Sequence, residues 1–193
     1  IIDKSVDSSL RLFYNRICII IKEGKNMLNK IIYEELGLAM RVTPRPIWNK
    51  KSQTSRNILN PLDVMNSHLA LLDKGASFVY YSTNLSINSK KIDAIKTVLF
   101  FSYKEKWAAL CDAKIISKED GSQFVPNDVS LENSSEYWLD EPNRTWIKLF
   151  NYRQINFETL DDFELENPNR SGAKTLGNLI SSSKRFNRVY IKN

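Results

Sequence analysis

Aromatic side chains that stand beside polar or basic residues are the best candidates for chemistry in this sequence. The chain has four Trp, eight Tyr and nine Phe. Such a ring can stack on a nucleobase, which is worth roughly 1 to 3 kcal/mol per base. Trp48 and Trp138 fall in predicted loops, where binding is favoured, whereas Trp107 and Trp146 fall on predicted strands, where core packing competes equally with binding. The aromatic residues therefore indicate recognition of a planar group, and a base is the leading candidate.

Catalytic residues are scarce by comparison. His68 is the only histidine, and its position inside a predicted helix favours a partly exposed helix residue over a catalytic base. The chain has neither a Ser-centred nucleophile motif nor a glycine-rich phosphate loop. Cys18 and Cys111 are far apart in apolar surroundings, so they predict neither a zinc site nor a disulfide framework. We therefore expect no enzyme activity in this chain, no cofactor and no metal ion.

One short fragment keeps an enzymatic alternative open. Asp112 and Lys114 form a D-x-K fragment on a predicted strand, and metal-dependent nucleases combine carboxylates with a lysine. That chemistry also needs an acid on a neighbouring strand, for which Asp93 is the only nominee. The alternative function is a metal-dependent nuclease that uses Asp112 and Lys114.

The net charge of +6 is distributed unevenly along the chain. Between Arg11 and Arg56 there are ten Lys and Arg residues against three Glu, and after Arg170 there are five basic residues and no acid. From Gly121 to Arg170, ten acidic residues stand against four basic ones. Clustered positive charge releases counterions from a phosphate backbone, so this segregation suits a polyanion. A solvated surface on which the asymmetry cancels in three dimensions fits equally well.

Hydrophobic periodicity predicts an α+β fold. Residues 1–40 are predicted to form a helical hairpin that ends near Gly37 and packs on the main body, and residues 41–60 a basic loop that contains prolines. Further predictions are a helix over Leu62–Leu72, strands over 77–82, 91–101, 106–116, 145–155 and 188–191, a helical turn over 159–163 and a short helix over 175–182. About five strands without regular strand–helix alternation favour a curved mixed sheet or a small β-barrel flanked by helices.

The N-terminal residues lead to expectations about cellular location, membrane association and partners. The longest apolar run near the start, Ile17–Ile21, is too short to cross a bilayer. No cleavable signal peptide is recognisable, so we expect a cytoplasmic protein without a membrane partner. The first residue is Ile and not Met, which suggests a piece of a larger protein. A protein–protein adaptor built on the N-terminal helical hairpin is a second alternative function.

From about Trp48 to the C-terminus, the order of motifs resembles the EVE/YTH-like branch of the PUA superfamily. Trp48 precedes a helix, then Gly75, then the strand Phe78–Ser82, where the family has a strand that ends in Tyr-His-Ser. Later segments are also similar to the family: the strand Trp146–Leu149, the acidic turn Thr159–Phe163 and the closing segment Ser183–Ile191. The chain departs from the pattern at three positions, with Ala76 in place of an acid, Tyr81 in place of the histidine and Asp93 in place of a glycine.

This resemblance implies that residues 41–193 form a PUA/EVE-like nucleic-acid-binding domain. Members of the branch bind modified bases in RNA or DNA, and some stand at the N-terminus of McrB-type modification-dependent restriction proteins. The implied function is to recognise a modified base, presumed methylated and flipped out of DNA rather than RNA, as the targeting domain of a restriction or defence protein that has further domains or a nuclease subunit. The implied base pocket contains Trp48, Tyr80, Tyr81, Ser82 and Trp146. The implied phosphate contacts are Lys50, Lys51, Arg56, Lys184, Arg185 and Arg188.

Overall fold

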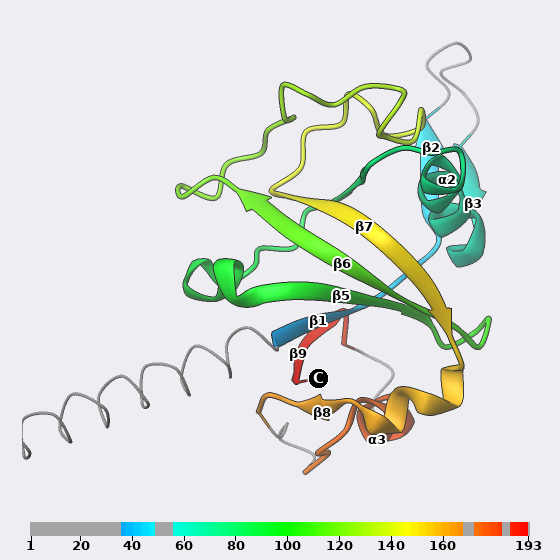
Figure 1. Ribbon diagram of the computed structural model, residues 1–193, viewed down its shortest axis with the longest axis vertical. Coiled ribbons are helices and arrows are strands. Elements are labelled where there is room, and N and C mark those ends of the chain that lie inside the picture. Colours follow the sequence, from blue (N-terminus) through cyan, green and yellow to red (C-terminus); the bar gives the residue numbers. More distant parts are fainter. Residues whose placement is uncertain (1–35, 49–55, 168–171, 183–185, 193) are drawn as a thin grey trace, which may run out of the picture. The chain divides into compact units, whose positions relative to one another are not determined.

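The core of the protein is an open, mixed seven-stranded β-sheet. The computed structural model describes residues 36–48, 56–167, 172–182 and 186–192. Parallel pairing joins β1 to β5, and every other pair in the sheet is antiparallel. In spatial order, the strands are β4 (Val79–Thr83), β7 (Thr145–Ile155), β6 (Trp107–Ser117), β5 (Ile95–Ser102), β1 (Leu36–Arg41), β9 (Arg188–Lys192) and β8 (Glu164–Leu165) (Figure 1).

This architecture confirms the predicted α+β class and the mixed sheet. The alternative of a small barrel is wrong, because β4 and β8 stand at the two ends of the strand order and do not pair with each other. The predicted number of about five strands is too low, because the described sheet has seven. The predicted strand over 145–155 matches β7, and the predicted strands over 106–116 and 188–191 match β6 and β9 to within one residue at each end.

Strand β1 corrects the helical prediction for its residues. Residues 36–40 were expected to belong to a helix that ends near Gly37, but they form a buried strand between β5 and β9. Gly37 is required here for close packing, because a Cβ atom would lie 2.8 Å from Cγ1 of Ile191 and 2.9 Å from Oγ1 of Thr97. The main body therefore begins at or before Leu36 and not at residue 41. The helical prediction for residues 1–35 lies outside the described residues.

Two short paired strands lie within the loop predicted over residues 41–60, so the loop prediction is wrong for these residues. Strand β2 (Arg45–Trp48) pairs antiparallel with β3 (Arg56–Leu59), and Pro46 lies opposite Ile58. Pro is tolerated in such a two-stranded ribbon, since its missing N–H can face away from the partner strand. Pro46 and Ile58 are both exposed, and Ile58 retains 67% of its accessible surface. The hairpin thus presents an apolar surface to its surroundings.

Helix α2 (Pro61–Asp73) confirms the predicted helix and its start signals. The Asn60 side chain caps it by accepting a hydrogen bond from the backbone N–H of Asp63 at 2.9 Å, and Pro61 occupies the first turn. The helix ends just before Gly75, whose φ of +96° lies in the left-handed region. Its buried face includes His68, and Figure 1 shows α2 next to the β2–β3 hairpin.

Alternating side chains on the central strands build two hydrophobic clusters. On β5, Val98 and Phe100 belong to the cluster that contains the buried face of α2, whereas Leu99 and Phe101 belong to the cluster beneath α3 (Leu176–Ser182). Two 3₁₀ helices, η1 (Ser89–Ala94) and η2 (Phe157–Asp162), connect strands; η2 confirms the predicted helical turn. None of the described helices is long and apolar enough to cross a membrane.

Candidate functional site

Two residues of the implied base pocket are enclosed between the sheet and the segment that connects β6 to β7. Tyr80 and Trp146 are each 1% exposed and meet edge to face, with ring centroids 5.6 Å apart. The Trp146 indole Nε1 donates to the carbonyl of Phe124 at 2.6 Å, and the Tyr80 hydroxyl donates to Asp128 Oδ1 at 2.6 Å. Both polar tips thus hold the connecting segment against the sheet. Neither ring reaches an open surface of the described residues.

The other two described residues of that implied pocket lie next to Tyr80 on β4. Tyr81 is 8% exposed, and its ring packs against His68 and Phe100 on the α2 side of the sheet. Ser82 is buried; its hydroxyl accepts a hydrogen bond from Asn143 Nδ2 at 3.1 Å, and its carbonyl accepts one from Arg45 Nη1 at 3.2 Å. Because neighbouring strand residues point to opposite faces, β4 cannot gather Tyr80 and Tyr81 in one pocket. The Trp48 side chain lies outside the described residues.

A cleft of about 360 Å³ opens instead between strand β2 and the segment that leads into β7. That volume lies within the usual range for small-molecule sites, roughly 300 to 1,000 Å³. Its lining combines aromatic rings, prolines and carboxylates: Pro46, Glu136, Tyr137, Trp138, Leu139, Asp140, Glu141 and Pro142. Tyr137 is 41% exposed, so an aromatic wall of the cleft is accessible from solvent.

Two consecutive turns place Trp138 and Glu141 together. The backbone N–H of Trp138 donates to the carbonyl of Ser135 at 3.1 Å, and the N–H of Glu141 donates to the carbonyl of Trp138 at 3.2 Å. Asn143 is buried, and its Nδ2 donates to the carbonyl of Glu141 at 3.0 Å as well as to Ser82. The loop that carries the acidic residue is therefore tied to β4 and held in place by hydrogen bonds.

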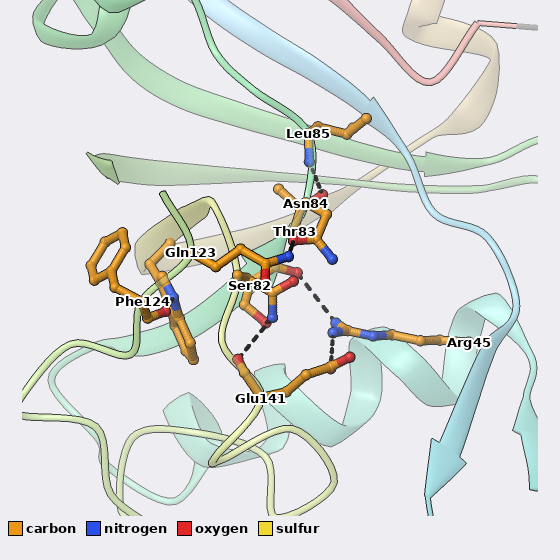
Figure 2. A network of polar contacts seen from close by, with 10 residues as sticks. Arg45, Ser82, Thr83, Asn84, Leu85, Gln123, Phe124 and Glu141 are labelled. Atoms are coloured by element: carbon orange, nitrogen blue, oxygen red, sulfur yellow. Dashed lines mark hydrogen bonds and ion pairs between the residues drawn. The ribbon is translucent and has the colours of Figure 1, made fainter. Parts of the chain in front are cut away.

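Trp138 lies at the centre of a cluster of aromatic and charged side chains. Its ring is stacked with that of His68, at a centroid separation of 5.2 Å and an angle of 16°. The guanidinium carbon of Arg45 lies over the indole, 4.4 Å from the ring centroid. Arg45 also donates from Nη2 to Glu141 Oε2 at 2.6 Å, and Figure 2 shows it reaching from β2 toward Ser82 and Glu141. Arg45 thus connects the hairpin to β4 and to the loop.

Three buried polar atoms in this cluster make no hydrogen bond of standard geometry among the described residues. They are Nδ1 and Nε2 of His68 and Nε1 of Trp138. Buried polar groups are satisfied in the large majority of cases, and an unsatisfied one costs roughly 1 to 3 kcal/mol. These nitrogens can form hydrogen bonds with water or with a ligand that reaches them.

The charge state of the cluster follows from its burial. Burial, reinforced by the positive charge of Arg45, lowers the pKa of His68 from 6.5 to about 3, although a weak hydrogen bond with the Tyr80 backbone acts in the opposite direction. The imidazole is therefore neutral at physiological pH. Burial also raises the pKa of Tyr81, although Arg45 acts in the opposite direction. The formal charges at the cleft are consequently those of Arg45 and of the carboxylates of Glu136, Asp140 and Glu141.

Most of the implied phosphate contacts fall outside the described residues. Lys50, Lys51, Lys184 and Arg185 are in this group, and so is the side chain of Arg56, whose backbone belongs to β3. Arg188 is described; it is partly buried on β9, opposite Met40 of β1. Acidic and basic residues are almost equal in number in the described part of the chain, so the surplus of positive charge comes from the other segments.

The D-x-K fragment lies on β6 without further metal ligands near it. Asp112 is exposed and accepts a hydrogen bond from Asn151 Nδ2 at 3.2 Å, and Lys114 lies opposite Lys148 of β7. Within the described ranges, no three His, Cys, Asp or Glu side chains lie close enough together to hold a metal ion. No observation in the described residues therefore favours the nuclease alternative.

Comparison with known protein families, with curated proteins and with solved structures finds no match to this chain. The case for a functional role of the cleft therefore depends on its geometry alone. Sequence analysis singled out Trp138 as a loop aromatic but missed Arg45 and Glu141, and its prediction of a partly exposed His68 is wrong, because His68 is 1% exposed. The one local signal was the run of acidic residues on either side of Trp138, because the contact with Arg45 joins residues far apart in the chain.

Proposed function

We propose that this chain is a nucleic-acid-binding module that holds a single, modified base in the cleft beside Trp138. The observation that carries the proposal is the cluster itself: a cleft with aromatic walls, beside a buried indole and a buried imidazole that make no hydrogen bond of standard geometry among the described residues. Buried polar groups are paired in most structures, and a ligand that donates and accepts hydrogen bonds would satisfy these.

The cleft supports this function through its combination of flat and polar surfaces. The rings of Tyr137 and Trp138 meet edge to face at 68°, with centroids 5.6 Å apart, so a base can stack on one of them but not between them; Pro46 adds an apolar wall. Flat apolar walls take up the faces of a base, and polar groups around them read its edge. Tyr80 and Trp146, which the resemblance implied as base contacts, are proposed here to support the fold. Tyr81 and Ser82 support the cleft from behind through His68 and Arg45.

Positive segments of the chain supply the phosphate contacts in this proposal. Lys50 and Lys51 follow β2 by two and three residues, and β2 carries Arg45 and Pro46 at the cleft. We therefore propose that Lys50 and Lys51 contact the phosphates of a nucleic acid bound at the cleft. Contacts of this kind fix register without reading sequence.

The fold proposal follows the same resemblance to the EVE/YTH-like branch. The order of elements supports this proposal: α2 is followed by Gly75 and β4, and β7 carries Trp146 and leads into η2. The described sheet is open, so the proposal concerns the order of elements and not a closed barrel.

A binding assay with paired variants tests the proposal. Fluorescence polarisation would compare duplexes with and without base methylation, and single strands, over ~50 to ~200 mM salt. Tyr137→Ala removes an exposed wall of the cleft, so affinity should fall roughly tenfold, within the range for a lost stacking partner. Leu131→Ala is the matched control, since Leu131 is also an exposed apolar residue of the segment before β7 and does not line the cleft.

Two outcomes would contradict the proposal. Equal affinity for methylated and unmethylated nucleic acid would refute recognition of a modified base. Equal losses in the Tyr137 and Leu131 variants would remove the cleft from binding. The double variant Lys50→Ala, Lys51→Ala separately tests the phosphate contacts, and it should reduce the slope of log affinity against log salt by about 2.

A further inference from the structure

Arg45 covers a face of Trp138 beside the cleft, although Arg45 is not one of the residues that line the cleft. Its flat guanidinium lies over the Trp138 indole at 4.4 Å, while its N–H groups donate to a carboxylate oxygen of Glu141 and to the carbonyl of Ser82. This arrangement contains the parts of a recognition site for a planar hydrogen-bond donor: an aromatic face, a carboxylate and a carbonyl. The Arg45 side chain is 19% exposed, so it lies between the ring and solvent.

A guanidinium has a close counterpart among the nucleobases. Guanine carries the fragment N–C–N in its six-membered ring, and N1–H and the N2 amino group are neighbouring donors on its Watson–Crick edge. Two neighbouring donors match the two oxygens of a carboxylate, as in an arginine–carboxylate pair. Adenine and cytosine present a donor beside an acceptor, and thymine a donor between two acceptors, so none of these bases can donate twice to Glu141.

The charges at the cleft narrow the choice of ligand further. Glu136 and Asp140 line the same cleft as Glu141, and Arg45 forms an ion pair with Glu141. A neutral base that displaced Arg45 would leave Glu141 without its counterion. Guanine methylated at N7 carries a positive charge and keeps both donors, so it replaces the guanidinium in shape, hydrogen bonding and charge.

Building on the proposed function, we infer that the base taken by this cleft is guanine, bound most tightly when methylated at N7. The base stacks on Trp138, and its N1–H and N2 amino groups donate to Glu141. Arg45 moves aside to make room. Arg45 thus competes with the base for the Trp138 ring. Because only molecules in which Arg45 has left the ring can bind the base, the apparent affinity is the intrinsic affinity multiplied by the fraction of such molecules.

The test uses short single strands of thymidine that differ in one central base, titrated against the whole chain. The central base is thymine, guanine, N7-methylguanine, O6-methylguanine, which lacks N1–H, or hypoxanthine, which lacks the N2 amino group. A strand whose base lacks one of the two donors to Glu141 should bind about tenfold more weakly, because a bidentate pair discriminates against a wrong base by about this factor. We therefore expect N7-methylguanine to bind most tightly, guanine next, and the other strands roughly tenfold more weakly than guanine.

Two variants with matched controls separate the two roles. Glu141→Gln removes the charge and one acceptor, so the preference for guanine over hypoxanthine should disappear, while Glu119→Gln, at an exposed position on the turn after β6, should retain it. Arg45→Ala removes the competitor and should tighten the binding of guanine strands about tenfold. Arg153→Ala, an exposed position on β7, should leave that affinity unchanged.

The outcomes distinguish this inference from the proposed function. If the strands bind and guanine has no advantage, or if Glu141→Gln keeps the preference, the guanine assignment is overturned and base binding as such stands. If Arg45→Ala weakens the binding of guanine strands, Arg45 contacts the ligand and the competitor role is wrong. If no strand and no duplex binds at any salt concentration, the proposed function fails and the inference fails with it.

Discussion

Replacing His68 with Phe isolates the energetic contribution of one buried imidazole. His68 is 1% exposed, and its pKa falls from 6.5 to about 3 because the charged form would be buried beside Arg45. Between those two pH values the unfolded chain binds a proton that the folded chain does not, so stability is lost as the pH falls below 6.5. Each pH unit in that window costs about 1.4 kcal/mol, which gives a loss of roughly 2 to 3 kcal/mol at about pH 4.5.

Denaturant unfolding of the wild type and His68→Phe over about pH 4.5 to 7.5 measures this loss. The carboxylates titrate in both proteins, so the difference between the two curves reports the histidine. As the pH falls to about 4.5, we expect the free energy of unfolding of the variant to rise by roughly 2 to 3 kcal/mol relative to that of the wild type. His68→Leu repeats the measurement with a smaller side chain, in case the larger ring of Phe strains the core.

Parallel pH curves for wild type and variant would refute the reasoning. A second readout is independent of unfolding: His68 is the only histidine, so its imidazole signals in an NMR spectrum are unambiguous. They should show no titration in the folded protein above about pH 4.5. A midpoint near the ordinary value of 6.5 would show that the imidazole reaches solvent or a partner.

Three further predictions concern the fold around the site. Gly37→Val should destabilise the protein by roughly 1 to 3 kcal/mol in thermal unfolding, because side chains of β5 and β9 fill the space that the new atoms need; an unchanged midpoint would contradict the close packing. Trp146→Phe removes the hydrogen bond to Phe124 and should cost roughly 1 to 3 kcal/mol without changing nucleic-acid affinity; a loss of affinity at equal folding would return Trp146 to the binding site. Asp128→Asn should have only a small effect on stability, below about 1 kcal/mol, because its ion pair with Lys148 is largely solvent-exposed on the Asp128 side and the Asn amide oxygen can still accept the hydrogen bond of the Tyr80 hydroxyl.

Elements with a strong local signal could be predicted from the sequence. The start of α2 combines Asn60, Pro61 and Asp63, each of which favours a helix N-terminus through its own physical effect. Strand β7 carries aromatic and aliphatic residues over its whole length, and both of its ends were predicted correctly. Here propensity, pattern and tertiary context agree.

Other elements depend on partners that are distant in sequence. Strand β1 is a continuous apolar run buried between two strands, and such a run has no period that separates it from a helix. Its Gly37 was interpreted as a helix end, although the glycine serves the packing of Ile191. The hairpin strand β2 was missed because prolines stand on either side of Arg45.

The same limit applies to the candidate site. The aromatic residues of β4 and β7 resembled a binding pocket in sequence, but alternation along β4 sends Tyr80 and Tyr81 to opposite faces of the sheet. The cleft arises where β2 meets the segment before β7, through the contact of Arg45 with Glu141. Residues 45 and 141 are far apart in sequence, and no local pattern links them.

The most direct test of a base in the Trp138 cleft is the indole N–H signal of each tryptophan in an NMR titration with an N7-methylguanine strand. The Trp138 indole has no partner among the described residues, whereas the Trp146 indole donates to Phe124. The account predicts a large shift of the Trp138 signal on binding and an unchanged Trp146 signal. A Trp138 signal that stays in place at saturation, or a shift confined to Trp146, would contradict it.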